Sequence, residues 1–129
     1  NAFKHTPNEG RIQLNLSTVD ANKYGLPLLY PSYYLFQVKD TGKGIAPENL
    51  EHIFERYFSK KSLSNKDVGT GIGLSYIKDL VEIHKGVIRV ESAIDHGSQF
   101  NIFIPVISVD LISLSRNSLS SLHKSLSSF

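Results

Sequence analysis

The chain contains no cysteine, no methionine and no tryptophan. Without cysteine, disulfide bonds and thiolate metal sites are excluded, and cysteine usage gives no indication of the redox compartment. Because position 1 is not methionine either, we expect the chain to be a fragment of a longer protein. No apolar run approaches the roughly 18 residues that a membrane-spanning helix needs, and no segment resembles a signal peptide.

An excess of charge of one sign is also missing. The chain has 14 basic and 12 acidic residues, which give a formal net charge of +2. This balance does not indicate a nucleic-acid partner. Of the 129 residues, 40% are hydrophobic and 20% are charged, so a globular fold is expected rather than disorder. The length suits one domain with a core of its own.

The spacing of apolar residues predicts an alternation of strands and helices. Strands are predicted over 11–17, 33–39, 87–92 and 99–106. Helices are predicted to end before Pro7, to run from Pro47 to Phe54, and to run from 71 to 83. The segments 19–32, 59–70 and 95–98 are predicted to be loops or turns. In the last strand, Phe100, Ile102 and Ile104 are predicted to share one face.

Two glycine clusters carry the strongest chemical signal. Asp40-Thr41-Gly42-Lys43-Gly44 follows a predicted strand, and Gly69-Thr70-Gly71-Ile72-Gly73 opens a predicted helix. Glycine allows backbone to approach a ligand closely, and a helix N-terminus favours phosphate. A carboxylate at a strand end can accept a hydrogen bond from an exocyclic amine such as that of adenine. Together these features indicate a nucleotide, although glycine turns with a purely structural role remain an alternative. Neither cluster has the spacing of a P-loop or of a dinucleotide fingerprint.

The order of motifs sharpens this hypothesis. The chain reads Asn1-Ala2-Phe3-Lys4-His5-Thr6, then the Asp40 cluster, Ile53-Phe54-Glu55-Arg56-Tyr57-Phe58, the Gly69 cluster with Leu74, and Gly97-Ser98-Gln99-Phe100. This order resembles the catalytic ATP-binding domain of sensor histidine kinases, whose fold is shared with type II topoisomerase ATPase subunits, mismatch-repair ATPases and ninety-kilodalton heat-shock chaperones. The five motifs match the N, G1, F, G2 and G3 boxes of that family, from residue 1 to about residue 106.

The resemblance implies an α/β (α+β) two-layer sandwich, the Bergerat ATP-binding fold. A mixed, mostly antiparallel sheet should carry helices on one face. The domain should span 1–107, truncated at its N-terminus. Residues 108–129 form a serine-rich tail with leucine at 111, 114, 119, 122 and 126. This spacing permits an amphipathic helix, so the tail is interpreted as a docking helix or a linker.

The resemblance also implies ATP and Mg²⁺ as ligands. Asn1 matches the asparagine that coordinates Mg²⁺ between the phosphates, and Lys4 matches a lysine that contacts phosphate. Asp40 matches the aspartate that binds the adenine amino group. Adenine should also be contacted by Gly42, Gly44 and Ile45, and by Ser98, often through water. The matching phosphate-binding turn comprises Gly69, Thr70, Gly71, Ile72, Gly73 and Leu74.

Each of these residues also has an ordinary structural interpretation. Asn1 and Lys4 would simply be the polar end of a helix. Asp40 would be a turn-forming residue, as aspartate before glycine often is, and Ser98 would be a turn serine. Phe54 and Phe58 match the F-box aromatics, which we expect to pack the base of a lid rather than to touch ATP.

Three positions depart from the family pattern. Many relatives carry an arginine where this chain has Ser59. Lys60 could supply the positive charge, without the bidentate fork of arginine, while Lys61 and Lys66 also suit solvated lid positions. Asp95 stands where the last box often has its first glycine. The helix upstream of Asn1 is absent from the chain, so the Mg²⁺ site is expected to be incomplete.

No residue of this chain is predicted to be catalytic. Sensor kinases carry the phosphoacceptor histidine on a separate dimerisation domain, and none of the five histidines here lies in such a context; His84 is interpreted as a helix cap, and the others are His5, His52, His96 and His123. The chain also shows no histidine or cysteine metal spacing and no nucleophile–base pair.

The resemblance thus implies a protein-histidine kinase whose partners are the histidine-containing dimerisation domain of the same protein and a response-regulator receiver domain. No nucleic-acid or membrane contact is expected of this chain, and its location should be cytoplasmic even if the parent protein is membrane-anchored. The lid at 59–70 is expected to order when nucleotide and Mg²⁺ bind. Two alternatives remain open, namely an anti-sigma-factor-like serine kinase and a degenerate, non-catalytic nucleotide-binding or docking module.

Overall fold

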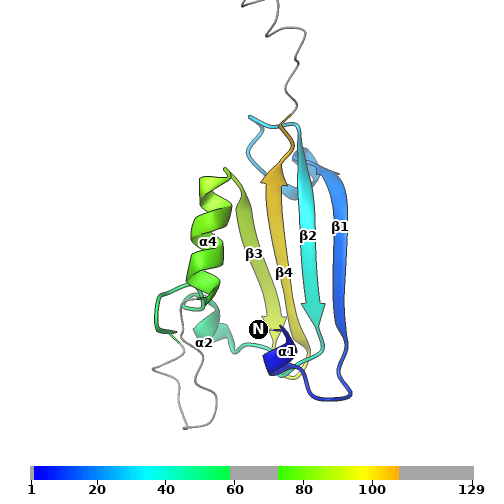
Figure 1. Cartoon of the computed structure of the whole chain (residues 1–129), viewed down its shortest axis with the longest axis vertical. Coiled ribbons are helices and arrows are strands. Elements are labelled where there is room, and N and C mark those ends of the chain that lie inside the picture. Colours follow the sequence, from blue (N-terminus) through cyan, green and yellow to red (C-terminus); the bar gives the residue numbers. More distant parts are fainter. Residues whose placement is uncertain (1, 59–72, 108–129) are drawn as a thin grey trace, which may run out of the picture.

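Four antiparallel strands form one sheet in the order β1–β2–β4–β3 (Figure 1). This computed structural model describes residues 2–58 and 73–107 of the chain, and the strand count refers to these residues. The strands are β1 (Ile12–Asp20), β2 (Ser32–Asp40), β3 (Val87–Ala93) and β4 (Gly97–Pro105). The predicted mostly antiparallel sheet is therefore confirmed, and all of its described strand pairs are antiparallel.

Each of the described helices contacts at least one strand of this sheet. They are α1 (Ala2–His5), the 3-10 helix η1 (Asn22–Tyr24), α2 (Pro47–Leu50) and α4 (Gly73–Ile83). Helix α4 lies alongside β3 (Figure 1) and contacts both β3 and β4. At its end, the His84 Nδ1 lies 2.8 Å from the Leu80 carbonyl oxygen and donates to it, which confirms the predicted cap. No helix in the described part of the chain is long and apolar enough to span a membrane.

The strand register decides which side chains share a face, because directly opposed residues of an antiparallel pair lie on the same side. Phe100, Ile102 and Ile104 share one face, as predicted, and pair with β2 residues of the same face. Val81 of α4 lies near Ile104 beside Gly86, which places the helix over this face. On the same face, the described residues leave four apolar side chains of β1 and β2 exposed, namely Leu14, Leu16, Tyr34 and Phe36.

The most deeply buried side chains lie on the opposite face. Tyr33 and Phe103 are almost completely inaccessible to solvent, and they pack with Leu35, Ala21 and Leu26. Ala21 and Leu26 belong to the connection between β1 and β2. This connection folds back over the face of the sheet that carries Tyr33 and Phe103. The Arg89 guanidinium from β3 donates to the carbonyl oxygens of Tyr24 at 2.6 Å and Gly25 at 3.2 Å. These contacts hold the connection against the sheet.

Among the described residues, three predicted boundaries were wrong by more than one residue. Strand β1 continues to Asp20, where a loop was predicted, because Thr18, Val19 and Asp20 pair with the first residues of β2. Helix α2 ends at Leu50 instead of Phe54, and turns follow it up to Tyr57, whose φ is +65°. Strand β4 begins at Gly97, inside the predicted 95–98 turn.

Tyr33 makes the stability of the fold depend on pH in the alkaline range. Burial, together with the neighbouring Tyr30, raises the pKa of Tyr33, and its hydroxyl donates to the Pro27 carbonyl oxygen at 2.9 Å. A phenol whose pKa is raised by folding stabilises the fold fully below its unfolded pKa of about 10. This contribution is lost as the pH rises through the folded pKa.

Tyr33→Phe should therefore lower the free energy of unfolding by about 1 kcal/mol at pH 8, because the Pro27 carbonyl loses its donor. The variant should lose less stability than the parent between pH 8 and about pH 10.5. Urea unfolding at both pH values measures this, with Tyr34→Phe on the exposed face as the control. An equal loss in Tyr33→Phe and parent would show that Tyr33 does not cause the alkaline sensitivity.

Candidate functional site

The loop that follows β2 is folded by Asp40 itself. Asp40 is 6% exposed, and its Oδ1 accepts a hydrogen bond from the Gly42 N–H at 2.8 Å. This two-residue pattern is an Asx turn, a common device of aspartate before glycine. Arg11 ties the loop to the start of β1, since its N–H donates to the Thr41 Oγ1 at 2.8 Å and its carbonyl accepts from the Thr41 N–H at 3.0 Å.

Helix α1 packs against one side of this loop. A Cβ atom at Gly42 would lie 2.3 Å from the His5 carbonyl oxygen, so a side chain at this position would collide with the helix end. The Lys43 N–H donates to the same carbonyl at 3.4 Å. From the resemblance, Gly42 is expected to allow adenine a close approach to the backbone. The geometry shows that the fold itself already requires glycine here.

The β3–β4 hairpin holds the other side of the loop. The Ile45 N–H donates to the Ser92 Oγ at 2.8 Å, and the Asp95 N–H donates to the Lys43 carbonyl at 2.9 Å. Gly44 has φ +71°, and a Cβ there would lie 1.9 Å from the Ala93 carbonyl oxygen. The loop is thus fixed between α1 and the hairpin before any ligand arrives.

Three polar side chains form a row across the end of the sheet. Asp40 of β2 is opposite Ser98 of β4, and Ser98 is opposite Ser92 of β3. The three side chains therefore lie on one face. Asp40 and Ser98 are both buried, and the oxygens of Ser92 and Ser98 are 2.9 Å apart. Buried polar groups of this kind need hydrogen-bonding partners.

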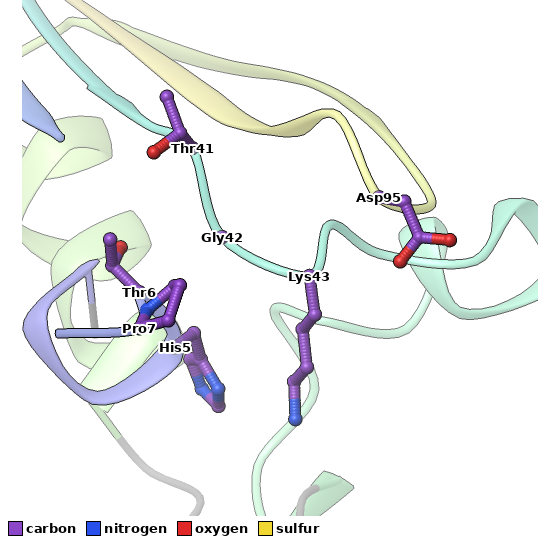
Figure 2. Close-up of a pocket in the computed structure, with 7 residues that line it drawn as sticks. All are labelled: His5, Thr6, Pro7, Thr41, Gly42, Lys43 and Asp95. Atoms are coloured by element: carbon purple, nitrogen blue, oxygen red, sulfur yellow. The ribbon is translucent and has the colours of Figure 1, made fainter. Parts of the chain in front are cut away.

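A pocket of about 510 Å³ opens beside the loop (Figure 2). This volume lies within the range of small-molecule sites. Figure 2 shows the side chains of His5 and Lys43 projecting to the same side of the loop, with Asp95 on the other side of Lys43 from His5. The lining residues are His5, Thr6, Pro7, Thr41, Gly42, Lys43 and Asp95. Lys43 adds a positive charge that suits an anionic ligand.

The predicted adenine-binding residues do come together. Gly42 lines the pocket and donates its N–H to the Asp40 carboxylate, and Gly44 and Ile45 continue the same loop. Ser98 is opposite Asp40 in the register. The structure thus brings these five positions into one cluster. Of the five, only Gly42 is among the residues that line the pocket.

The predicted phosphate-binding residues are described in part. Gly73 and Leu74 form the first turn of α4, and Lys4 belongs to α1, with its side chain outside what the structure describes. The remaining predictions, which include the magnesium ligand and the lid, lie outside the described residues: Asn1, Lys60, Gly69, Thr70, Gly71 and Ile72. Within the described ranges, no three histidine, aspartate or glutamate side chains gather in a way that could hold a metal ion.

The F-box segment is tied to α4 rather than to the pocket. The Arg56 Nη2 lies 3.3 Å from the Asp79 Oδ2, and the Lys78 ammonium lies 6.0 Å from the centre of the Phe54 ring. Phe58 stacks on the imidazole of His52 with the ring centres 5.8 Å apart. Neither aromatic residue is among those that line the pocket. These contacts favour the structural role predicted for Phe54 and Phe58.

Sequence reasoning missed Ser92 and most of the pocket wall. Ser92 stands 47 residues from its partner Ile45, so nothing in its local sequence marks it. His5, Thr41 and Lys43 are adjacent to motif residues and could have been found by treating each motif as a continuous segment. Asp95 was noticed only as a departure from the family pattern.

Comparisons with known proteins agree with this geometry. A family model described as "Histidine kinase-, DNA gyrase B-, and HSP90-like ATPase" matches residues 1–108. The sensor histidine kinase RppB of Synechocystis sp. is 35% identical over 113 residues, which make up 87% of this chain and 22% of RppB. The chain therefore spans about a fifth of that relative's length.

Solved structures show the same similarity. The mycobacterial sensor histidine kinase MprB matches with a TM-score of 0.64 and 29% identity, over 81% of this chain and 64% of that one. Full-length ShkA, solved in complex with AMPPNP, matches with a TM-score of 0.60 and 25% identity, over 83% of this chain and 20% of ShkA.

Proposed function

Because this chain belongs to the family of histidine kinase-, DNA gyrase B- and HSP90-like ATPases, we propose that it presents ATP to a phosphoacceptor histidine on a separate dimerisation domain. Its relatives are sensor histidine kinases, and the chain corresponds to their ATP-binding catalytic domain. The observation that carries the proposal is the buried Asp40 carboxylate, held at a strand end by the Gly42 N–H in a loop fixed on both sides.

The base-binding part of the site is the better defined. The Asp40 Oδ1 is occupied by the Gly42 N–H, which leaves Oδ2 to accept a hydrogen bond from the adenine amino group. Hydrogen bonds to a charged acceptor contribute about 1.5–3 kcal/mol each. Gly44 and Ile45 would flank the base, and the Ser98 hydroxyl would contact it directly or through water.

The phosphate-binding part rests on the resemblance. Lys4 and Lys60 would contact phosphate, and the turn from Gly69 to Leu74 would offer backbone N–H groups at the start of α4. Mg²⁺ would take the Asn1 carboxamide oxygen together with phosphate oxygens, since magnesium prefers oxygen ligands. Lys43, which lines the pocket, adds one cation to this side of the site.

The chemistry follows from positioning. ATP supplies the phosphoryl group when bound, and little covalent chemistry is left for the protein to do. The residues of this chain bind the nucleotide, neutralise charge and hold it in line with the incoming histidine, which is the main source of acceleration in such transfers. The phosphoryl group would then pass to an aspartate on a receiver domain. We place these steps in the cytoplasm.

Labelling of the intact parent protein with γ-labelled ATP tests this proposal. The expected product is a phosphohistidine outside residues 1–129, recognised by its lability in acid and stability in base. The isolated chain should bind ATP with little turnover. Acid-stable label on a small partner protein would instead favour the serine-kinase alternative. ATP binding without label would favour a non-catalytic module.

A further inference from the structure

Ser92 lies at the centre of the hydrogen bonds that join the loop to the sheet. Its Oγ lies 2.8 Å from the Ile45 nitrogen, 2.9 Å from the Gly97 carbonyl oxygen and 2.9 Å from the Ser98 Oγ. The hydroxyl thus joins its own strand β3 to two other segments, namely the loop after β2 through Ile45 and the first two residues of β4, Gly97 and Ser98. The proposed function gives Ser92 no part in binding the nucleotide.

Counting hydrogens fixes the direction of each bond. A serine hydroxyl has one hydrogen and two lone pairs. The Ile45 N–H can only donate, so it uses one lone pair of Ser92. The Gly97 carbonyl can only accept, so it takes the single hydrogen of Ser92. The contact with Ser98 must then use the second lone pair of Ser92, and Ser98 is the donor.

This bond direction limits the hydrogen bonds that Ser98 can make to a ligand beside Asp40. Because the Ser98 hydrogen points to Ser92, the remaining capacity of Ser98 is to accept. Asp40 is opposite Ser98 on the same face, where Cβ atoms of such a pair are about 4.5–5.5 Å apart. An ionised carboxylate also only accepts. This end of the sheet therefore offers two neighbouring acceptors.

From this geometry we infer that Ser92 is a positioning residue that selects an amino group over a keto group on the bound base. The inference rests on the proposed nucleotide site and deepens it. A 6-amino purine offers donors to both Asp40 and Ser98. A 6-oxo purine places an acceptor against two acceptors, and buried acceptors that are left without a donor weaken its binding.

The test compares ATP with inosine triphosphate, which carries an oxo group in place of the 6-amino group. Calorimetric titration of the 129-residue chain should show a clear preference for ATP. Ser92→Ala frees the Ser98 hydroxyl to rotate and donate, so the preference should fall by about tenfold. Ser92→Thr keeps the hydroxyl and should keep the preference. Ser17→Ala, a substitution at an exposed serine of β1, is the control for exchanging serine in a strand.

The ratio of the ATP and inosine triphosphate affinities distinguishes a role of Ser92 in base selectivity from a purely structural role in holding the loop. Loosening of the loop through the lost Ile45 bond would weaken both nucleotides together and leave the ratio unchanged. An unchanged ratio in Ser92→Ala would overturn the inference while leaving the nucleotide site intact. If the unsubstituted 129-residue chain binds neither nucleotide, the proposed function is overturned, and the inference with it. Should Ser92→Ala fail to fold, Ser92→Cys carries the same test, because a thiol keeps the volume but accepts hydrogen bonds weakly.

Discussion

Asp40→Asn is expected to weaken ATP binding by about 10- to 100-fold, which corresponds to the loss of one hydrogen bond to a charged group. The asparagine Oδ1 can still accept from the Gly42 N–H, so the Asx turn survives. The other carboxylate oxygen becomes an NH₂ group, which meets the adenine amine donor to donor. The substitution thus changes recognition while leaving the loop in place.

Calorimetric titration measures the affinity, and urea unfolding checks the fold. Asp20→Asn is a matched control, because the Asp20 Oδ1 accepts from the Asn22 N–H at 2.8 Å in the same two-residue pattern, at the opposite end of the sheet. This control should bind ATP like the parent. If Asp40→Asn also binds ATP as tightly as the parent, Asp40 does not contact the base and the site has been assigned to the wrong residue.

Gly44→Ala should be the most destabilising single-methyl substitution in the loop, with a loss of at least about 3 kcal/mol in the free energy of unfolding. Two costs add together. The φ of +71° is unfavourable for any residue with a Cβ, and the new methyl group would lie 1.9 Å from the Ala93 carbonyl oxygen. Relief of that contact would separate the loop from the hairpin, so ATP binding should fall as well.

Gly25→Ala separates the two costs. Gly25 has φ +59°, but nothing lies within 4 Å of a Cβ at this position. The control should therefore lose only the conformational part, about 1–2 kcal/mol. Urea unfolding of both variants gives the comparison. Equal losses in Gly44→Ala and Gly25→Ala would mean that the loop does not need its close contact with Ala93.

The strands were largely predictable because their apolar alternation is local. The pattern of Phe100, Ile102 and Ile104 placed one face correctly. The error at Asp20 arose because Gly25, Pro27 and Pro31 made the whole segment resemble a loop, whereas β2 is long enough to pair with β1 to its end. The burial of Phe103 on the other face depends on the connection folding back over the sheet, which no local pattern encodes.

The candidate site was predictable where chemistry and turn coincide in a short motif. Asp40, Gly42 and Gly44 stand in one such motif, and the structure gathers them as expected. The reason for each glycine was predicted only in part, since the contacts with His5 and Ala93 come from distant segments. Ser92 was missed for the same reason.

Part of the predicted site remains a prediction from the sequence. The magnesium ligand Asn1, the cation Lys60 and the turn from Gly69 to Ile72 lie outside the described residues. The interpretation of residues 108–129 as a docking helix or linker is likewise a prediction, because these residues lie outside the part of the chain that the structure describes.

We expect this chain to bind ATP through Asp40. The decisive experiment is calorimetric titration of the 129-residue chain with ATP and with GTP, each with and without Mg²⁺. ATP should bind saturably, and more tightly when Mg²⁺ is present. GTP should bind more weakly by about tenfold or more, because guanine places a keto oxygen where Asp40 needs a donor. Equal affinity for both nucleotides, or binding of neither, would show that Asp40 does not recognise adenine in this chain.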